Sequence, residues 1–224
     1  MSQTADPTGS ALPRPAPAAD RGPLDDQFYE LVEERFRRLL RDNPVAATWF
    51  GIHDYDDELG DGGRETILGE IAAARAHLSA IEGLDPDGLS ATVRFERDLE
   101  LHNLQRALFE ADELRIWERR SLALDTVGDG LFLLFVRDHA PLAERLGAIA
   151  GRLESMPGYL DAARTRSQEP QVRLWQRIEI ESAGQLPALF DEMVAAAEAL
   201  NDPANGIYGF VARGLKNANV PSRP

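Results

Sequence analysis

Apolar residues recur at intervals of three and four over most of this chain, which is the spacing that places side chains on one face of an α-helix. The clearest stripe consists of Leu142, Leu146, Ile149 and Leu153. Pro141 suits the first helical position before this stripe. Pro157 predicts that the helix stops there and that a new one begins.

Similar stripes predict further helices along the chain. The first consists of Phe28, Leu31, Val32, Phe36, Leu39 and Leu40, and the second of Ile67, Ile71, Ala74, Leu78 and Ile81. Ser90 is expected to cap a long helix that runs to about Trp117. Its inward residues are predicted to be Phe95, Leu99, Leu101, Leu104 and Leu108.

Shorter signals complete the predicted fold. Asn43 can cap a short helix that Gly51 closes in the left-handed conformation. The segment 128–137 is expected to be helical, although composition alone would also fit a buried strand. Pro170 is expected to open a last pair of helices. Because no useful length of period-two alternation occurs, we predict an all-α fold.

Composition divides the chain into three parts. Residues 1–23 are rich in Pro and Ala and hold few large apolar groups, so we expect a disordered tail there. Residues 24–200 are predicted to form the helical domain, and residues 201–224 an irregular or short-helical tail.

Charge and residue usage exclude several classes of protein. The formal net charge of −14 would repel a nucleic-acid backbone or an anionic lipid surface. Runs of the ~18 apolar residues that a membrane helix needs are absent from the sequence. Cysteine is absent, which excludes disulfides and thiol catalysis. Without a visible secretory signal, we expect a cytoplasmic location.

An acidic loop is the first candidate for chemistry. His53, Asp54, Asp56 and Glu58 could offer ligands to a hard cation. As a calcium loop, however, the segment would need Gly at its sixth position, where Leu59 stands. A solvated acidic loop between two helices explains the same residues, and we favour it, although cation binding by the loop 53–61 stays open.

A second candidate is the pair Asp98 and His102, which are four positions apart and so share one helix face. A carboxylate there could orient the imidazole as a general base requires. A di-iron helical site would instead need Glu-x-x-His, and residue 99 is Leu. We therefore favour an ordinary intrahelical pair.

Strong catalytic motifs are missing. The chain has four histidines, His53, His77, His102 and His139, and none stands in the His-Glu-x-x-His spacing of zinc peptidases. A Gly-x-Ser-x-Gly nucleophile elbow and a phosphate-binding loop are also absent. We predict no catalytic, cofactor-binding or metal-binding residues and no bound cofactor in this chain.

Several segments nevertheless resemble a known family. They are 44–59, Gly88-Leu-Ser90 before a helix that holds Asp98, Arg137-Asp-His-Ala-Pro141, 152–164, and Glu169-Pro170. In this order they are similar to the N-terminal half of the bacterial "domain of unknown function 885" family, over roughly residues 25–200. The resemblance implies the first half of a larger helical fold. Complete members look like zinc metallopeptidases with a His-Glu-x-x-Pro-Gly-His motif in the C-terminal half, which no position here matches.

The resemblance leaves two main hypotheses. The chain is either the N-terminal portion of a metallopeptidase-like protein, inert alone, or a stand-alone helical module that binds another protein. Its expected partners are accordingly a missing C-terminal half, encoded downstream, or a second copy of the chain. A weaker third hypothesis is an independent metal-binding enzyme that uses the acidic loop. The sequence does not identify a substrate.

Overall fold

The computed structural model describes residues 21–167 and 171–200, and within them the regular structure is helical throughout, which confirms the all-α prediction. The elements are α1 (Asp25–Asp42), α2 (Pro44–Trp49), α3 (Arg64–Glu82), a 3-10 turn η1 (Pro86–Gly88), α4 (Ala91–Phe109), a π turn η2 (Glu110–Leu114), α5 (Ile116–Arg119), α6 (Ala123–Val136), α7 (Leu142–Arg164), α8 (Arg173–Ala183) and α9 (Leu186–Ala199). None of the described helices is long and apolar enough to cross a bilayer.

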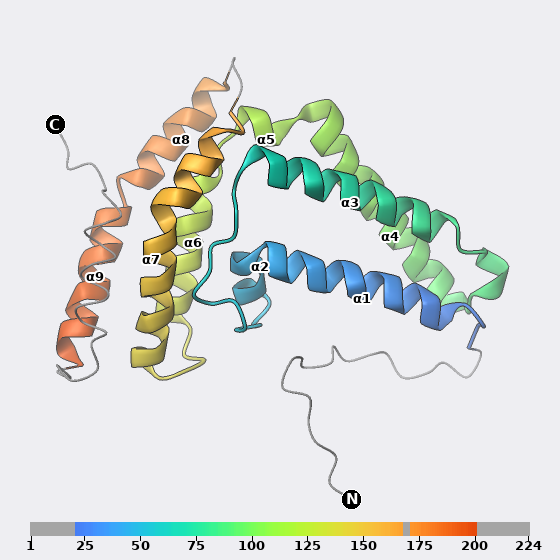
Figure 1. Ribbon diagram of the computed structural model, residues 1–224, viewed down its shortest axis with the longest axis horizontal. Helices are drawn as coiled ribbons and strands as arrows, with labels where there is room; N and C mark the ends of the chain where they lie inside the picture. Colours follow the sequence, from blue (N-terminus) through green and yellow to red (C-terminus); the bar gives the residue numbers. More distant parts are fainter. Residues whose placement is uncertain (1–20, 168–170, 201–224) are drawn as a thin grey trace, which may run out of the picture.

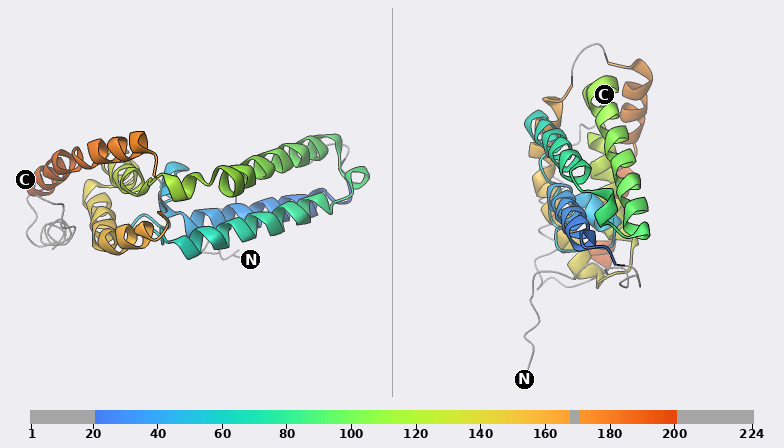
Figure 2. Two further views of the ribbon diagram at one scale, coloured as in Figure 1. Left: turned by 90° about the horizontal axis from the view of Figure 1, so that it is seen from above. Right: turned by 90° about the vertical axis from the view of Figure 1, so that its right-hand side faces the viewer.

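The helices form two groups with separate hydrophobic cores. Helices α1, α3 and α4 run alongside one another and project away from the group formed by α6, α7, α8 and α9 (Figures 1 and 2). The core of the first group contains Phe28, Ile81, Leu84, Leu89 and Val93. The core of the second group draws on α6, α7 and α9, and it includes Val45 of α2 and Leu59. Helix α2 therefore packs with the second group.

The stripe on α7 is buried as its spacing predicts. Leu146, Ile149 and Leu153 are all fully buried against α6 and its neighbours. At the other group, Asp25 joins the start of α1 to the start of α4, because its carboxylate accepts hydrogen bonds from the backbone N–H groups of Ser90 and Gly22. Burial alone would raise the pKa of Asp25, but these hydrogen bonds hold it below its ordinary value.

The long helix after Ser90 differs from its prediction in two respects. Ser90 does cap α4, since its hydroxyl accepts from Val93 N–H, but α4 ends at Phe109 and a π turn follows. Phe95 and Leu99 face solvent, with exposed fractions of 70% and 49%. Leu104 is fully buried, as predicted, and it shares the inward face of α4 with Val93 and Arg97.

Pro157 does not end the helix, contrary to the prediction. Helix α7 continues through it to Arg164. A proline inside a helix costs about 3 kcal/mol, but the buried side chains of Met156 and Tyr159 on either side favour a continuous helix. Pro141 stands one position before the helix rather than inside it.

Other local predictions have mixed outcomes. Gly51 adopts the expected left-handed conformation with φ of 78°. Asn43 lies at the N-cap of α2 but its side chain donates to Glu70 instead of capping the helix. The tails predicted for residues 1–20 and 201–224 lie outside the described residues, as does Pro170. Gly22, which belongs to the predicted N-terminal tail, is described, and it packs closely on the backbone of Gly88 to Ser90.

Candidate functional site

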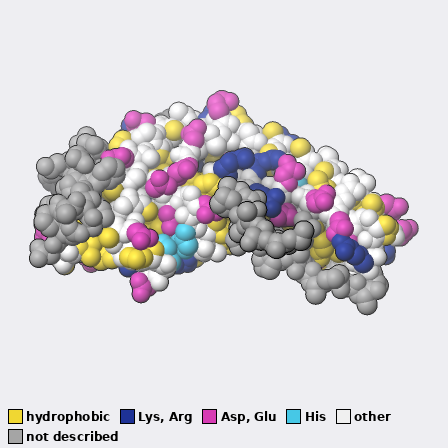
Figure 3. Space-filling view, turned by 60° about the horizontal axis from the view of Figure 1, so that its bottom comes forward, with side chains coloured by type: hydrophobic (Ala, Val, Ile, Leu, Met, Phe, Trp, Pro, Cys, Tyr) yellow, Lys and Arg dark blue, Asp and Glu magenta, His cyan; other side chains and the backbone are white. Residues whose placement is uncertain are grey.

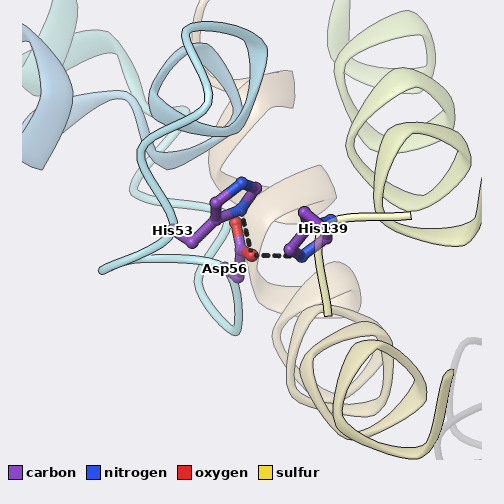
Figure 4. Close-up of side chains that lie close together, drawn as sticks. All are labelled: His53, Asp56 and His139. Atoms are coloured by element: carbon purple, nitrogen blue, oxygen red, sulfur yellow. Dashed lines mark hydrogen bonds and ion pairs between the residues drawn. The ribbon is translucent and has the colours of Figure 1, made fainter. Parts of the chain in front are cut away.

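Two loops bring His53, Asp56 and His139 together (Figure 4). His53 and Asp56 lie in the loop that follows α2, and His139 lies in the loop between α6 and α7. The Asp56 Oδ2 atom lies 2.8 Å from His53 Nδ1 and 3.3 Å from His139 Nε2. One carboxylate oxygen thus contacts an imidazole nitrogen from each loop.

The two imidazole rings are stacked. Their centroids are 3.8 Å apart and their planes differ by 2°. The second nitrogen of His139, Nδ1, lies 3.2 Å from the carbonyl oxygen of Arg137. Because a carbonyl only accepts hydrogen bonds, His139 must carry a proton on Nδ1 to make this contact. The side chains of His53 and His139 are 34% and 16% exposed, so the site opens at His53.

Asp56 is oriented from its other side by Thr48 and Arg152. The Thr48 hydroxyl donates to Asp56 Oδ1 at 2.7 Å and accepts from Arg152 Nη2 at 2.6 Å. The same Nη2 lies 3.9 Å from Asp56 Oδ1. One oxygen of the Asp56 carboxylate therefore faces the histidines, and the other is hydrogen-bonded to Thr48 in the buried interior.

Arg152 is fully buried and charged, and backbone carbonyls satisfy its guanidinium. It donates to Glu58 O at 3.0 Å and to Gly130 O at 2.6 Å in addition to Thr48. Burial lowers its pKa to about 10, while the charges of Asp56 and Asp57 oppose that shift. The group is still cationic near neutral pH, so it fixes α6, α7 and the acidic loop around one positive charge.

Two further arginines hold the loop that carries His139. Arg145 donates to the carbonyl oxygens of Phe135 and Ala140, and so closes the end of α6. Arg137 donates to the carbonyl oxygens of Thr48 and Trp49 and thereby joins this loop to the end of α2. Carbonyls at helix ends lack intrahelical donors, and these guanidinium groups supply them.

A glycine permits the close approach of α7 to the acidic loop. A Cβ added at Gly151 would lie 2.8 Å from the carbonyl oxygen of Asp57 and 2.9 Å from its Cβ. Such distances are too short for any side chain. The loop that carries His53 and Asp56 can therefore rest directly on the α7 backbone.

The structure places the other sequence candidates outside this cluster. Asp54 and Glu58 are exposed and do not join the group that His53, Asp56 and His139 form. Asp98 pairs with Arg97, its neighbour in the chain, at 3.3 Å. His102 is exposed on α4, and no hydrogen bond links it to Asp98.

His139 was not predicted to belong to the site. It lies 86 positions from His53, so no local spacing connects the two. The one signal that marked it was the segment Arg137-Asp-His-Ala-Pro141, which belongs to the family-like pattern. Two residues of that segment contribute to the site: Arg137 donates to the Thr48 carbonyl oxygen, and His139 contacts Asp56.

A histidine patch is visible on the molecular surface among acidic and hydrophobic side chains (Figure 3). Chemically, the cluster offers two imidazole nitrogens and one carboxylate oxygen, all within 4.8 Å of one another. Such a set can share protons or bind a cation.

Comparison of the fold with solved structures finds a candidate lipoprotein of unknown function from Shewanella oneidensis. The TM-score is 0.72 with 16% sequence identity, which shows a shared fold. The match covers 85% of this chain but 35% of that protein, so the chain spans about a third of its length. Among curated proteins, none matches the sequence.

A family model described as "Bacterial protein of unknown function (DUF885)" matches residues 44–212. This match includes α2, the acidic loop, both site histidines and Arg152. It covers most of the chain. The chain is therefore a member of the DUF885 family.

Proposed function

We propose that this chain is the N-terminal helical portion of a longer, zinc-peptidase-like DUF885 protein and does not hydrolyse peptides by itself. The observation that carries the proposal is the fold match, in which 85% of this chain corresponds to 35% of a longer protein. The sequence resemblance to the first half of complete members agrees with it. The chain then serves as a scaffold on which the remaining helices complete a cleft.

The surface of α8 supports this proposal. This helix buries none of its residues, and Leu174 and Ile180 are 58% and 71% exposed. It is nevertheless fixed in place, because Glu179 accepts hydrogen bonds from the Ser121 hydroxyl and Leu124 N–H at the start of α6. Exposed apolar side chains on a fixed helix are suited to being covered, and we assign that role to the C-terminal helices of the complete protein.

The test compares this chain with a full-length DUF885 protein in one peptidase assay with a mixture of fluorogenic peptides. We expect hydrolysis by the full-length protein, its loss on chelation and its recovery with zinc, and no turnover by this chain. Hydrolysis by this chain alone would contradict the scaffold role. A full-length protein that neither binds zinc nor cleaves peptides would contradict the peptidase-like assignment.

The exposed face of α4 favours a second candidate, a helical module that binds another protein. Phe95 and Leu99 are exposed on α4, which is a different helix from α8. The two candidates differ in solution behaviour. A module that binds through α4 should lose dye binding in Phe95→Ser, whereas a portion of a larger protein that is covered at α8 should lose it in Ile180→Ser.

A further inference from the structure

We propose that His53, Asp56 and His139 form a binding site for a divalent transition-metal ion, with Nδ1, Oδ2 and Nε2 as the respective ligand atoms. The nitrogen–oxygen separations are 2.8 and 3.3 Å. Ligand atoms around a tetrahedral zinc ion with bonds of about 2.0–2.2 Å lie roughly 3.3 Å apart. The two distances from Asp56 Oδ2 to the imidazole nitrogens are therefore close to the spacing of ligand atoms around such an ion.

The hydrogen bond that His139 makes through Nδ1 leaves Nε2 as the nitrogen available to a metal ion. Nδ1 carries the proton that contacts the Arg137 carbonyl, so in the neutral ring Nε2 presents a lone pair. That lone pair faces Asp56 Oδ2, which is itself an acceptor, at 3.3 Å. Two acceptors that face each other need a proton or a cation between them. A histidine whose second nitrogen donates to a carbonyl is the usual arrangement of a metal ligand.

Asp56 is prepared in the same way. Its Oδ1 atom accepts from the Thr48 hydroxyl, which is in turn fixed by Arg152, so Oδ2 is directed at the histidines. These contacts lie behind the carboxylate and leave its other oxygen available. Both the carboxylate and His139 thus have an outer layer of hydrogen bonds that orients them.

His53 is the adjustable ligand. The lone pair of an imidazole lies in the plane of its ring, and parallel rings 3.8 Å apart cannot both direct their lone pairs at one ion. One ring must therefore turn when the ion binds. His53 is the more exposed of the two and sits on a surface loop, so we assign the rotation to it.

The donor set selects the class of metal. Two imidazoles with one carboxylate suit Zn²⁺ and its neighbours Co²⁺, Ni²⁺ and Cu²⁺, whereas Ca²⁺ and Mg²⁺ prefer oxygen ligands alone. Four carboxylates in the same loop, those of Asp54, Asp56, Asp57 and Glu58, attract a cation to this face. Three protein ligands leave a fourth position for water or for a group from the rest of a longer protein.

The experiment uses the tag-free chain with ZnCl₂ in isothermal titration calorimetry and with CoCl₂ in visible absorption spectroscopy. We expect one ion per chain and cobalt bands typical of a four-coordinate site with nitrogen ligands. His53→Ala and His139→Ala should each weaken binding by more than about tenfold, since even the loss of an outer-layer contact costs that much. His102→Ala, which removes an exposed histidine on α4, is the matched control and should bind as the unchanged chain does.

Different results would overturn the proposal. Binding that survives His139→Ala but weakens in Asp54→Asn would place the ion on the exposed acidic loop instead. An absence of both heat and cobalt bands at millimolar metal would show that the cluster is a hydrogen-bonded network alone. Circular dichroism of each variant ensures that weaker binding does not reflect unfolding. The metal site does not depend on the scaffold role, because metal binding is measured on this chain and peptide hydrolysis on the full-length protein.

Discussion

Arg152 donates a 2.6 Å hydrogen bond to the hydroxyl of Thr48, 104 positions earlier in the chain. That hydroxyl donates onward to Asp56, so the orientation of the site carboxylate depends on a guanidinium in the interior. A buried charge of this kind is stable only while its partners are in place. The stability of the second helical group and the geometry of the site are therefore linked.

Replacing Arg152 with Met should lower the free energy of unfolding by about 3–5 kcal/mol, because the change leaves the buried Asp56 and several carbonyl acceptors without their partner. Urea denaturation followed by circular dichroism measures the effect. Arg164→Met is the matched control on the same helix, since that side chain is 81% exposed, and it should change stability by less than about 0.5 kcal/mol. Similar losses in both variants would contradict the role given to Arg152.

Two glycines of α7 should respond oppositely to alanine. Gly151→Ala places a Cβ against the Asp57 backbone and should cost about 1–3 kcal/mol. Gly147 has nothing within 4 Å of the added Cβ, so Gly147→Ala should raise stability by roughly 0.5–1 kcal/mol through its higher helix propensity. Thermal unfolding of the pair gives the comparison. A stabilising Gly151→Ala would mean that the acidic loop does not rest on α7.

Acid should weaken the contact between α3 and α5 through Glu118. Burial alone would raise its pKa, but Arg115 and Arg64 hold the pKa below its ordinary value. A carboxyl group whose folded pKa is lowered stabilises the fold above its unfolded pKa, and this contribution is lost as pH falls through the folded pKa. Glu118→Gln should therefore be less stable than the unchanged chain near neutral pH, and the difference should shrink in acid.

Urea unfolding at a series of pH values measures this difference. The exposed Glu65 on α3 provides the control substitution, Glu65→Gln, which should follow the unchanged chain throughout. A Glu118→Gln curve parallel to that of the unchanged chain would show that Glu118 does not contribute to acid sensitivity.

The exposed apolar side chains of α8 should cause self-association of the isolated chain. Ile180→Ser removes a side chain that is 71% exposed, and it should reduce both hydrophobic-dye fluorescence and the sedimentation coefficient at high concentration. Phe95→Ser removes an equally exposed side chain from α4 and separates an effect of α8 from one of general surface hydrophobicity. Equal effects of the two substitutions would contradict the prediction that α8 in particular causes the self-association.

The helical fold could be predicted because burial follows spacing on most helices, as for Leu146 and Ile149 on α7. Predictions failed where one helix carries apolar residues on two faces. Phe95 and Leu99 share a spacing that suits burial, but α1 and α3 pack against the face of Val93 and Leu104. The hydrophobic pattern of a helix does not show which of its two apolar faces the neighbouring helices cover.

Two of the three site residues were accessible from the sequence. His53 and Asp56 are three positions apart, so a loop scan finds both as candidates. His139 could not be paired with them, because their proximity depends on how α6 and α7 pack beside α2. Asp54 and Glu58 have the same chemistry as Asp56, and tertiary contact with Thr48 and Arg152 alone distinguishes Asp56 from them.

The presence of two cores means that the chain has two places at which local opening can begin. Val45 and Leu59, which flank the site loop, belong to the core of α6, α7 and α9, whereas α1, α3 and α4 are held by the other core. A ligand at the site would slow amide hydrogen exchange in α2, α6 and α7 and leave exchange in α3 and α4 nearly unchanged. The connection at Asn43 and Pro44, where α1 meets α2, then separates a half of the molecule that responds to ligand from a half that does not.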